Sequence, residues 1–231
     1  MSTVLITGAN RGIGLEFVRQ YAADGWRVFA ATRNLAAAEE LQKLAQEHSK
    51  TVQILMLDVI DESTIRGAAT QVGDLPVDVL INCAGVYGGA RQRLGNMDYE
   101  AWMKVLDVNT LGPARVTEAF IENVARSERK LIASITSGMG SLQDNTSGAY
   151  IAYRTSKAAL NMVMRSLAVD LATRGITSIV INPGWVKTRM GGPQAKLTPA
   201  ESVTAMRKVF EKAGAAQSGK FFNYDGREYP W

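Results

Sequence analysis

The sequence predicts an α/β fold in which one domain, residues 1–231, forms a doubly wound parallel sheet of about seven strands with helices on both faces. Strand and helix patterns alternate along the whole chain, as is typical of parallel sheets. The length of 231 residues suits one domain of this kind, and 46% hydrophobic residues supply a full core. No internal repeat, low-complexity tract or linker divides the chain.

The first predicted unit is a buried strand over residues 2–7, a loop with glycines at positions 8, 12 and 14, and a helix. A helix N-terminus offers free N–H groups and a positive dipole end to a pyrophosphate. Gly8 permits a tight turn, Gly12 allows the backbone to approach phosphates, and Gly14 lets the helix pack closely on the strand. This order of elements predicts a dinucleotide-binding turn. The apolar face of the helix is formed by Leu15, Phe17, Val18 and Tyr21.

The later elements are predicted from apolar runs of strand length and from apolar residues at helical spacing. Strands are expected over residues 27–32, 52–58, 77–82, 130–136, 176–182 and 220–224. Helices are expected over residues 36–47, 62–71, 99–127, 150–174 and 199–212. Residues 85–96 are rich in glycine and predict a loop. Gly112-Pro113 predicts a bend in the helix over 99–127, because the apolar period resumes beyond it.

Tyr153 and Lys157 lie four residues apart at the start of the helix over 150–174. Residues at this spacing share one helical face, so the ammonium group can lie beside the phenolic oxygen. A phenol titrates near pH ~10, and a neighbouring positive charge lowers its pKa. The pair therefore predicts a general acid/base.

The glycine spacing Gly8-x-x-x-Gly12-x-Gly14, together with Tyr153-x-x-x-Lys157, resembles the short-chain dehydrogenase/reductase family. The resemblance covers essentially the whole chain and implies a Rossmann-like fold. The C-terminal string from Gly219 to Gly226, with the final Pro-Trp, resembles the C-factor and sniffer-type carbonyl reductase branch. Further motifs in the expected order are Asp58-Val59, Asn82-Cys83-Ala84-Gly85, Asn109, Ser137 and Pro183-Gly184-Trp185-Val186-Lys187-Thr188. Cys83 departs from the family, which usually has a second Asn there; the backbone contacts should survive this change.

The resemblance implies four catalytic residues. Tyr153 would be the general acid in carbonyl reduction, and Lys157 would lower the pKa of Tyr153 and bind the nicotinamide ribose hydroxyls. Ser137 would hold the carbonyl oxygen where negative charge develops. Asn109 would bind a water that links Lys157 to solvent; the alternative is a helical Asn that bonds to backbone.

The choice of Ser137 has an alternative in Ser141. In many family members the serine lies thirteen residues before the tyrosine, and Gly140 occupies that position here. Ser137 implies a three-residue insertion within residues 143–148, whereas Ser141 implies a deletion of one residue. Ser137 is preferred because it directly follows a strand, at the carboxyl edge of the sheet where active crevices form.

The expected cofactor is NADP(H). The second strand ends in Ala30-Ala31-Thr32 without the acid that binds the ribose 2′-hydroxyl of NAD. Arg33 follows it and Arg11 lies in the glycine loop, so the two arginines can pair with a 2′-phosphate. The alternative is that one or both are solvated surface. Asp58 would accept from the adenine amino group, or act only as a strand-end cap, and Thr188 would bond near the nicotinamide carboxamide. Other expected cofactor contacts are Gly8, Asn10, Gly12, Ile13, Gly14, Val59, Asn82, Ala84, Gly85, Tyr153, Lys157, Pro183, Gly184 and Val186.

Composition argues against several other classes of protein. The net charge of +4 is spread along the chain without a basic cluster, which disfavours nucleic acid as a partner. His48 is the only histidine, which excludes a His-based triad or a multi-His metal site, and no metal is expected. A single cysteine, Cys83, predicts a reducing compartment and core packing. No apolar run reaches membrane-span length and the first strand leaves no room for a signal peptide, so we expect a soluble cytoplasmic protein.

These observations predict an NADPH-dependent carbonyl reductase that acts on a hydrophobic aldehyde, ketone or quinone. A short substrate loop over about 184–199 predicts an open site, and Trp185 is placed to line it, with Met139, Met190 and Tyr87 as further wall residues. The long insertion that some carbonyl reductases carry before Tyr153 is absent. In related enzymes that insertion covers the dimer-forming helices, so the resemblance implies a homodimer or homotetramer. The alternative is a C-factor-type sensor that binds NADP(H) with little turnover; an epimerase or dehydratase fits less well, because few residues follow the Pro-Gly turn.

Overall fold

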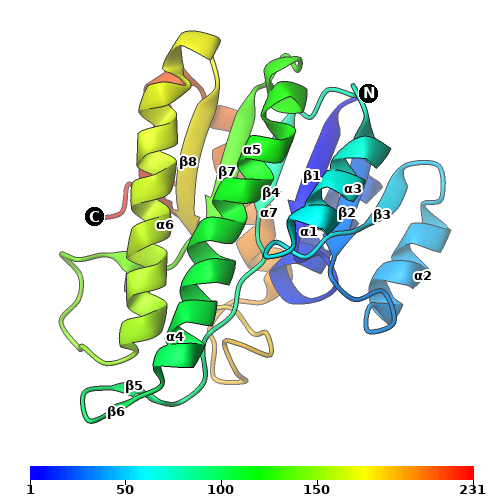
Figure 1. The fold of residues 1–231 in the computed structure, drawn as a ribbon. Helices are drawn as coiled ribbons and strands as arrows, with labels where there is room; N and C mark the ends of the chain where they lie inside the picture. Colours follow the sequence, from blue (N-terminus) through cyan, green and yellow to red (C-terminus); the bar gives the residue numbers. More distant parts are fainter.

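The computed structural model describes all 231 residues and confirms the predicted sheet. Seven parallel strands lie in the order β3-β2-β1-β4-β7-β8-β9 (Figure 1). The strands are β1 (Thr3–Thr7), β2 (Arg27–Thr32), β3 (Val52–Met56), β4 (Val79–Asn82), β7 (Leu131–Ile135), β8 (Thr177–Asn182) and β9 (Phe221–Asn223). The helices are α1 (Gly12–Ala23), α2 (Glu39–Glu47), α3 (Glu62–Val72), α4 (Tyr99–Leu106), α5 (Gly112–Ala125), α6 (Ile151–Asp170) and α7 (Pro199–Lys212).

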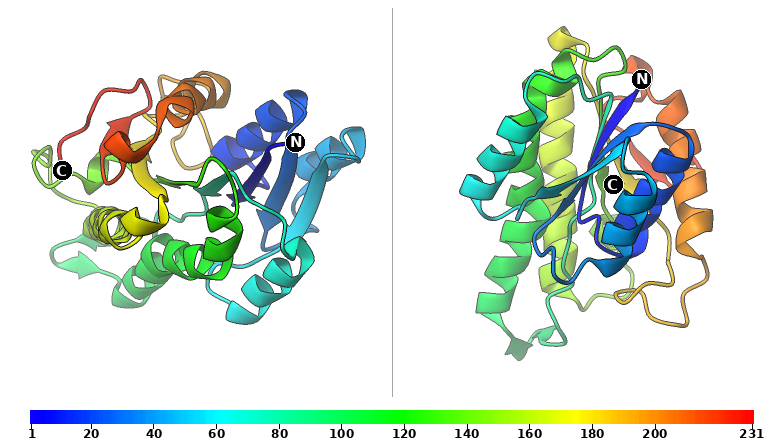
Figure 2. Two further views of the ribbon diagram at one scale, coloured as in Figure 1. Left: turned by 90° about the horizontal axis from the view of Figure 1, so that it is seen from above. Right: turned by 90° about the vertical axis from the view of Figure 1, so that its right-hand side faces the viewer.

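Helices cover both faces of the sheet because successive strand residues point to opposite sides. Val4 and Ile6 of β1 pack with α1, α2 and α7, whereas Leu5, between them, packs with α3, α5 and α6. Each face thus has its own apolar cluster, and Figures 1 and 2 show the resulting three layers. The strands inside the sheet are buried on both sides, which explains their nearly continuous apolar sequences, whereas the edge strand β3 is partly exposed.

The strand order reverses at β1, which pairs with β2 on one side and β4 on the other. The connections after these strands leave in opposite directions, so a crevice forms at their carboxyl ends, where ligands bind in sheets of this kind. This edge lies at the bottom of Figure 1, together with the loop after β8 and the start of α6. The topology therefore places the predicted glycine loop and Tyr153 at the same edge.

The segment predicted as one bent helix over 99–127 consists of α4, a π-helical turn η1 (Asp107–Leu111) and α5. The irregularity therefore comes before Gly112-Pro113 and not at it. Pro113 has no N–H for the carbonyl of Asn109, and its ring would crowd that carbonyl. The N–H of Gly112 instead donates to the carbonyl of Asp107, five residues earlier. The wider turn relieves the crowding and keeps the helices connected.

Other boundaries also differ from the predictions, several of them by one to four residues. The loop over residues 85–96 contains a short antiparallel hairpin, β5 (Gln92–Arg93) with β6 (Asn96–Met97). The second helix begins at Glu39, not at residue 36, and the first helix already begins at Gly12. The glycine loop therefore runs directly into the first turn of α1.

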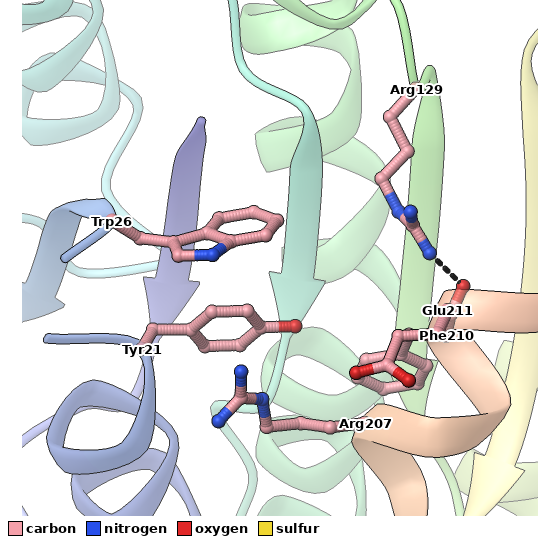
Figure 3. A pocket seen from close by; sticks show the side chains of 6 residues that line it. All are labelled: Tyr21, Trp26, Arg129, Arg207, Phe210 and Glu211. Atoms are coloured by element: carbon pink, nitrogen blue, oxygen red, sulfur yellow. Dashed lines mark hydrogen bonds between the residues drawn. The ribbon is translucent and has the colours of Figure 1, made fainter. Parts of the chain in front are cut away.

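A cavity of about 30 Å³ lies between α1 and α7. Figure 3 shows that the ring of Tyr21 lies between Trp26 and the guanidinium of Arg207; that guanidinium is 4.3 Å from the ring centroid. Arg207 also pairs with Asp24, and Arg129 donates to the carbonyl of Phe210. Because Trp26 precedes β2 and Arg129 precedes β7, the cavity is at the amino-terminal edge. It lies where two helices pack together and has room for little more than a water molecule. Trp26, predicted as core, is only partly buried.

Candidate active site

The glycine loop has the backbone geometry that its three glycines allow. Gly8 and Gly12 have φ angles of +68° and +57°, in the left-handed region that favours glycine. A Cβ on Gly8 would lie 2.8 Å from the Cα of Ala84, and one on Gly14 would overlap the carbonyl oxygen of Gly8. The N-cap residue Arg11 makes no side-chain cap, so the first-turn N–H groups of α1 are available to an anion.

Thr7 ties the ends of β1 and β4 together. Its hydroxyl oxygen accepts hydrogen bonds from the N–H groups of Cys83 and Ala84, at 3.0 Å and 3.1 Å. The buried Asn82 donates to the hydroxyls of Thr117 and Ser134, each at 3.2 Å. The floor of the crevice is therefore fixed by side chains on both sides. Sequence reasoning missed the role of Thr7, because a Thr at a strand end carries no signal of its own.

The residues predicted for the adenosine end lie at the carboxyl ends of β1, β2 and β3. The glycine loop is held beside β2, since the N–H of Ala9 donates to the carbonyl of Ala31 at 3.0 Å. Arg11 and Arg33 are exposed, and neither forms an ion pair. Asp58 is partly buried, and one carboxylate oxygen accepts from the N–H of Ile60 at 3.2 Å. The unpaired arginines and open helix N-terminus fit a phosphorylated dinucleotide. No acid occupies the end of β2.

Tyr153, Ser137 and Lys157 come together at the start of α6. Tyr153 is 8% exposed, and the Ser137 side chain lies near enough to its phenol to lower the pKa of that group. The Lys157 Nζ lies 5.8 Å from the centroid of the Tyr153 ring and donates to the carbonyl of Ile135 at 2.9 Å. A Cβ on Gly140 would lie 2.9 Å from Lys157, so the glycine lets α6 pack closely on residues 137–141, the serine loop. The phenol, hydroxyl and amine therefore share one wall of the crevice.

The pKa values of this pair differ from the expectation. Burial raises the pKa of Tyr153 to about 12, and the Ser137 side chain offsets part of the rise. Burial lowers the pKa of Lys157 to about 8, with Cys83 acting weakly in the opposite direction. Desolvation is the largest cause of both shifts, and the Lys157 amine donates to the carbonyl of Ile135 and not to the phenol. The lowering of the Tyr153 pKa that we expected is therefore not found in this structure.

The buried Lys157 predicts that unfolding free energy rises with pH between about 8 and 9. Its folded pKa of about 8 lies below its ordinary 10.5, so the unfolded chain binds more protons in this range and stability increases with pH. Cys83 and Tyr153 have raised pKa values but begin to oppose this effect only above their ordinary 9.0 and 10.0. Urea unfolding of the unliganded protein should show the rise, and Lys157→Met should abolish it. An unchanged slope in the variant would contradict the burial argument.

Asn109 is fully buried in η1, and its side chain forms hydrogen bonds with other groups of the protein. Its oxygen accepts from the N–H of Val86 at 2.8 Å, and its amide donates to the Val86 carbonyl at 2.8 Å and to the Ser156 hydroxyl at 3.0 Å. The side chain thus bonds to backbone, as the alternative for Asn109 has it, and fixes the chain after Gly85; the water-binding role stays a prediction. A Cβ on Gly85 would lie 3.3 Å from the Asn109 oxygen and 3.8 Å from Lys157 Nζ.

The two candidate serines occupy different environments. Ser137 is the N-cap of the short 3₁₀ turn η2 (Gly138–Gly140), and its oxygen accepts from the N–H of Met139 at 3.1 Å. Ser141 is buried, donates to the carbonyl of Trp231 at 3.0 Å and accepts from the N–H of Asp144 at 3.0 Å. Ser137 is therefore beside Tyr153, while Ser141 anchors the C-terminal tail.

The C-terminal tail packs beneath the serine loop. The Tyr229 hydroxyl donates to Asp144 at 2.7 Å, and a Cβ on Gly138 would lie 2.6 Å from that hydroxyl. The Tyr229 and Trp231 rings pack on Phe221 with centroid distances of 4.9 Å and 5.5 Å. The last strand and the tail thus support the loop that carries Ser137.

An aromatic wall lies next to Tyr153. The Tyr87 ring packs on Tyr153 at a centroid distance of 4.9 Å and on Tyr150 at 5.5 Å. Burial, followed by the neighbouring Tyr150, raises the pKa of Tyr87 to about 12. Tyr150 has a φ of +49° and ends a loop that is exposed to solvent. Met139, predicted for this wall, is partly buried.

Residues 183–198 form the connection between β8 and α7. The carbonyl of Pro183 accepts from the Ser202 hydroxyl at 2.7 Å, and Gly184 has a φ of +78°. Val186 is buried and bridges to Leu197. The methyl of Thr188 lies 3.3 Å from the position of a Cβ on Gly12, so this connection contacts the glycine loop. Trp185 and Met190 are about half exposed and available to a ligand.

Two features are absent from the chain. The chain has no group of three or more His, Cys, Asp or Glu side chains that could hold a metal ion. None of the helices combines the length and apolar character needed to cross a membrane. Cys83, the one cysteine, is partly buried and packs against the core.

Comparison with known proteins gives a consistent set of relatives. A family model described as short chain dehydrogenase matches residues 2–197. The C-signal protein of Myxococcus xanthus is 46% identical over 167 residues, which are 72% of this chain and 100% of that protein. The carbonyl reductase Sniffer of D. melanogaster has a TM-score of 0.92 and 33% identity, with full coverage of both chains. An NADPH-bound carbonyl reductase from chicken fatty liver has a TM-score of 0.93 and 35% identity, covering 100% of this chain and 99% of that one.

Proposed function

Because the chain belongs to the short-chain dehydrogenase family and is an oxidoreductase of that type, we propose that it is an NADPH-dependent carbonyl reductase. The observation that carries the proposal is the buried Tyr153 phenol, with Ser137 and Lys157 beside it, at the same sheet edge as the glycine loop. A protein that only binds the cofactor would not need a proton donor next to a hydroxyl that can stabilise a developing oxyanion.

NADPH supplies a hydride to the carbonyl carbon when it is bound. Tyr153 donates its proton to the carbonyl oxygen, because a phenol with a raised pKa is protonated at neutral pH. The Ser137 hydroxyl donates a hydrogen bond to the same oxygen as negative charge develops there. Lys157, whose buried amine has a pKa near 8, carries positive charge at neutral pH and stabilises the phenolate that remains. Asn109 holds the chain after β4 in place around this group.

The proposed cofactor contacts follow the geometry of the crevice. The N–H groups at the start of α1 would hold the pyrophosphate, and Arg11 and Arg33 the 2′-phosphate. Asp58, Val59, Ala84 and Gly85 would line the adenosine and ribose positions, while Pro183, Val186 and Thr188 would lie at the nicotinamide end. The structural neighbour from chicken fatty liver is described as NADPH bound, which supports the same choice here.

We infer that the substrate is a hydrophobic aldehyde, ketone or quinone. The wall beside Tyr153 is formed by Tyr87 and Tyr150, and Trp185 and Met190 are half exposed on the connection after β8. Flat apolar carbonyl compounds can stack on such rings. Both solved structures compared above are described as carbonyl reductases.

The test is NADPH oxidation by the purified protein with a panel of aromatic aldehydes, ketones and quinones. Turnover of at least one class, with NADPH preferred over NADH, is the expected result. Tight NADPH binding with no turnover on any of these compounds would overturn the reductase proposal.

The second candidate function is signalling, in which NADP(H) is bound with little turnover. The 46% identity to a protein described as C-signal favours it. The complete set of Ser137, Tyr153 and Lys157 at the site argues for turnover instead. The panel experiment separates the two, since binding without turnover is the result that a sensor predicts. For either function we expect a reducing compartment such as the cytoplasm, because Cys83 has no partner for a disulfide.

We propose a homodimer or homotetramer. Met103 on α4 and Met162 on α6 are 67% and 66% exposed, and these helices pack side by side. Large exposed apolar side chains on adjacent helices are typical of an interface. Sedimentation should give an oligomer, and Met103→Glu with Met162→Glu should shift it toward monomer. Leu35→Glu, at a 38% exposed position before α2, is the matched control and should not change the mass. A wild-type monomer would contradict the proposal.

A further inference from the structure

Gln92 is a buried glutamine that connects two parts of the catalytic wall. It is 1% exposed, although it lies in the short strand β5 within a glycine-rich loop. Its amide nitrogen donates to the carbonyls of Tyr87 and Gly89 at 2.7 Å and 2.8 Å. Its amide oxygen accepts from the backbone N–H of Tyr153 at 2.9 Å. Both amide hydrogens and the oxygen are therefore used, and none of these bonds involves solvent.

The bond to Tyr153 replaces a missing helix cap. Tyr153 is the third residue of α6, and N–H groups in the first turn have no partner within a helix. The N-cap residue Tyr150 has left-handed backbone angles and provides no side-chain cap. The acceptor for Tyr153 comes instead from Gln92, sixty-one positions earlier in the chain. The helical turn that carries the phenol is thus held by the loop opposite it.

The other end of Gln92 fixes the ring that packs on the phenol. Tyr87, whose carbonyl accepts from Gln92, packs its ring on that of Tyr153 at 4.9 Å. Gly88 has a φ of +89°, and a Cβ there would overlap Val105 and approach the Gln92 amide to 3.4 Å. The loop therefore wraps around the Gln92 amide. A single side chain sets the backbone positions of both rings.

We propose that Gln92 is a positioning residue of the reductase. Its hydrogen bonds to the backbone of Tyr153 and of Tyr87 fix the position of the Tyr153 phenol relative to the Tyr87 ring. This inference rests on the proposed function for its effect on turnover, but the geometry it describes does not. Loss of the amide would leave the N–H of Tyr153 and two carbonyls unpaired in a buried place. A shift of about 1 Å in a catalytic group can lower turnover about 100-fold.

The test compares Gln92→Leu with a matched control, Asn123→Leu. Asn123 is 5% exposed, and its amide donates to the carbonyls of Gly73 and Leu75 at 2.7 Å and 2.9 Å. It thus bridges two loop carbonyls as Gln92 does, but at the amino-terminal edge of the sheet. Both substitutions remove a buried amide, so both should lower the denaturation midpoint.

We expect Gln92→Leu to lower kcat about 10- to 100-fold with an NADPH Kd within about twofold of wild type, whereas Asn123→Leu should keep kcat within about twofold. Amide hydrogen exchange at Tyr153, followed by NMR, should accelerate in Gln92→Leu and not in Asn123→Leu. Gln92→Glu keeps an acceptor for the Tyr153 N–H, so it should retain this protection and an intermediate kcat.

The proposal is overturned if Gln92→Leu keeps wild-type kcat, if it loses no more kcat than Asn123→Leu, or if exchange at Tyr153 is unchanged. Should Gln92→Leu fail to fold, kcat and amide hydrogen exchange at Tyr153 are measured for Gln92→Glu and compared with Asn123→Leu. An intermediate kcat with the Tyr153 N–H still protected supports the proposal. A wild-type kcat overturns it. Should the wild-type protein reduce no carbonyl compound, the reductase proposal fails, and exchange at Tyr153 alone decides the role of Gln92.

Discussion

Tyr153→Phe is expected to lower turnover by about 10²- to 10⁴-fold, the usual contribution of a general acid, while NADPH binding stays within about twofold of wild type. The substitution removes only the phenolic oxygen. The ring remains buried and can still pack on Tyr87, and the backbone N–H still reaches Gln92. The expected loss is therefore confined to the proton and to the interaction of the phenol with Ser137. Steady-state rates with the best carbonyl substrate, together with NADPH titration by fluorescence, measure both quantities.

Tyr87→Phe is the matched control for this experiment. Tyr87 is also an aromatic phenol in the wall, with a pKa raised to about 12 by burial, and its ring lies 4.9 Å from that of Tyr153. Its substitution removes the same atom from a neighbouring ring. We expect kcat to stay within a few fold of wild type, since the side chain of Tyr87 lies beside Tyr150, and Ser137 is not among the groups that shift its pKa. Equal losses in the two variants would refute the assignment of Tyr153 as the proton donor.

Local patterns were sufficient to predict most of the fold and part of the site. The glycine loop follows a buried strand and begins a helix, and the structure shows the positive φ angles at Gly8 and Gly12 that this order requires. The alternation of apolar segments predicted the parallel sheet because strands covered on both faces have continuous apolar sequences. The spacing of Tyr153 and Lys157 placed both on one face of α6. Each of these features depends on a few neighbouring residues.

Features that depend on contacts between distant segments were missed. Gln92 and Thr7 act through hydrogen bonds that span 61 and 76 or more positions, and no local pattern marks them. The choice between Ser137 and Ser141 could not be made by counting residues, because it depends on the C-terminal tail that binds Ser141. The π-helical turn is a local feature: Pro113 predicted an irregularity in the helix, but not its place before Gly112 or its wider hydrogen-bond spacing.

The electrostatics of the catalytic pair could not be predicted from spacing either. Four residues of separation indicate that Lys157 and Tyr153 share a face, but not which group the amine contacts. In the structure the amine donates to Ile135, and burial dominates both pKa values. Desolvation depends on how the surrounding segments close over the pair, so its size follows from the packing of the whole chain.

Arg11→Ala combined with Arg33→Ala is expected to lower kcat/KM for NADPH about 100-fold and to leave kcat/KM for NADH nearly unchanged. A hydrogen bond to a charged group contributes roughly 1.5–3 kcal/mol, and we expect the low end, about tenfold per arginine, because both side chains are exposed. Only NADPH carries the 2′-phosphate with which they would pair. Initial rates at varied concentrations of each cofactor measure the two constants.

Arg66→Ala is the matched control, because Arg66 is an exposed arginine on α3 that pairs with Glu62 and lies away from the glycine loop. It changes the net charge by one unit without touching the end of β2, so a general effect of charge on NADPH would appear in it as well. The unpaired state of Arg11 and Arg33 is what separates them from Arg66: both can bind a ligand without first leaving an acid. A double variant that still prefers NADPH as strongly as wild type would show that these arginines are solvated surface, and that other residues choose the cofactor.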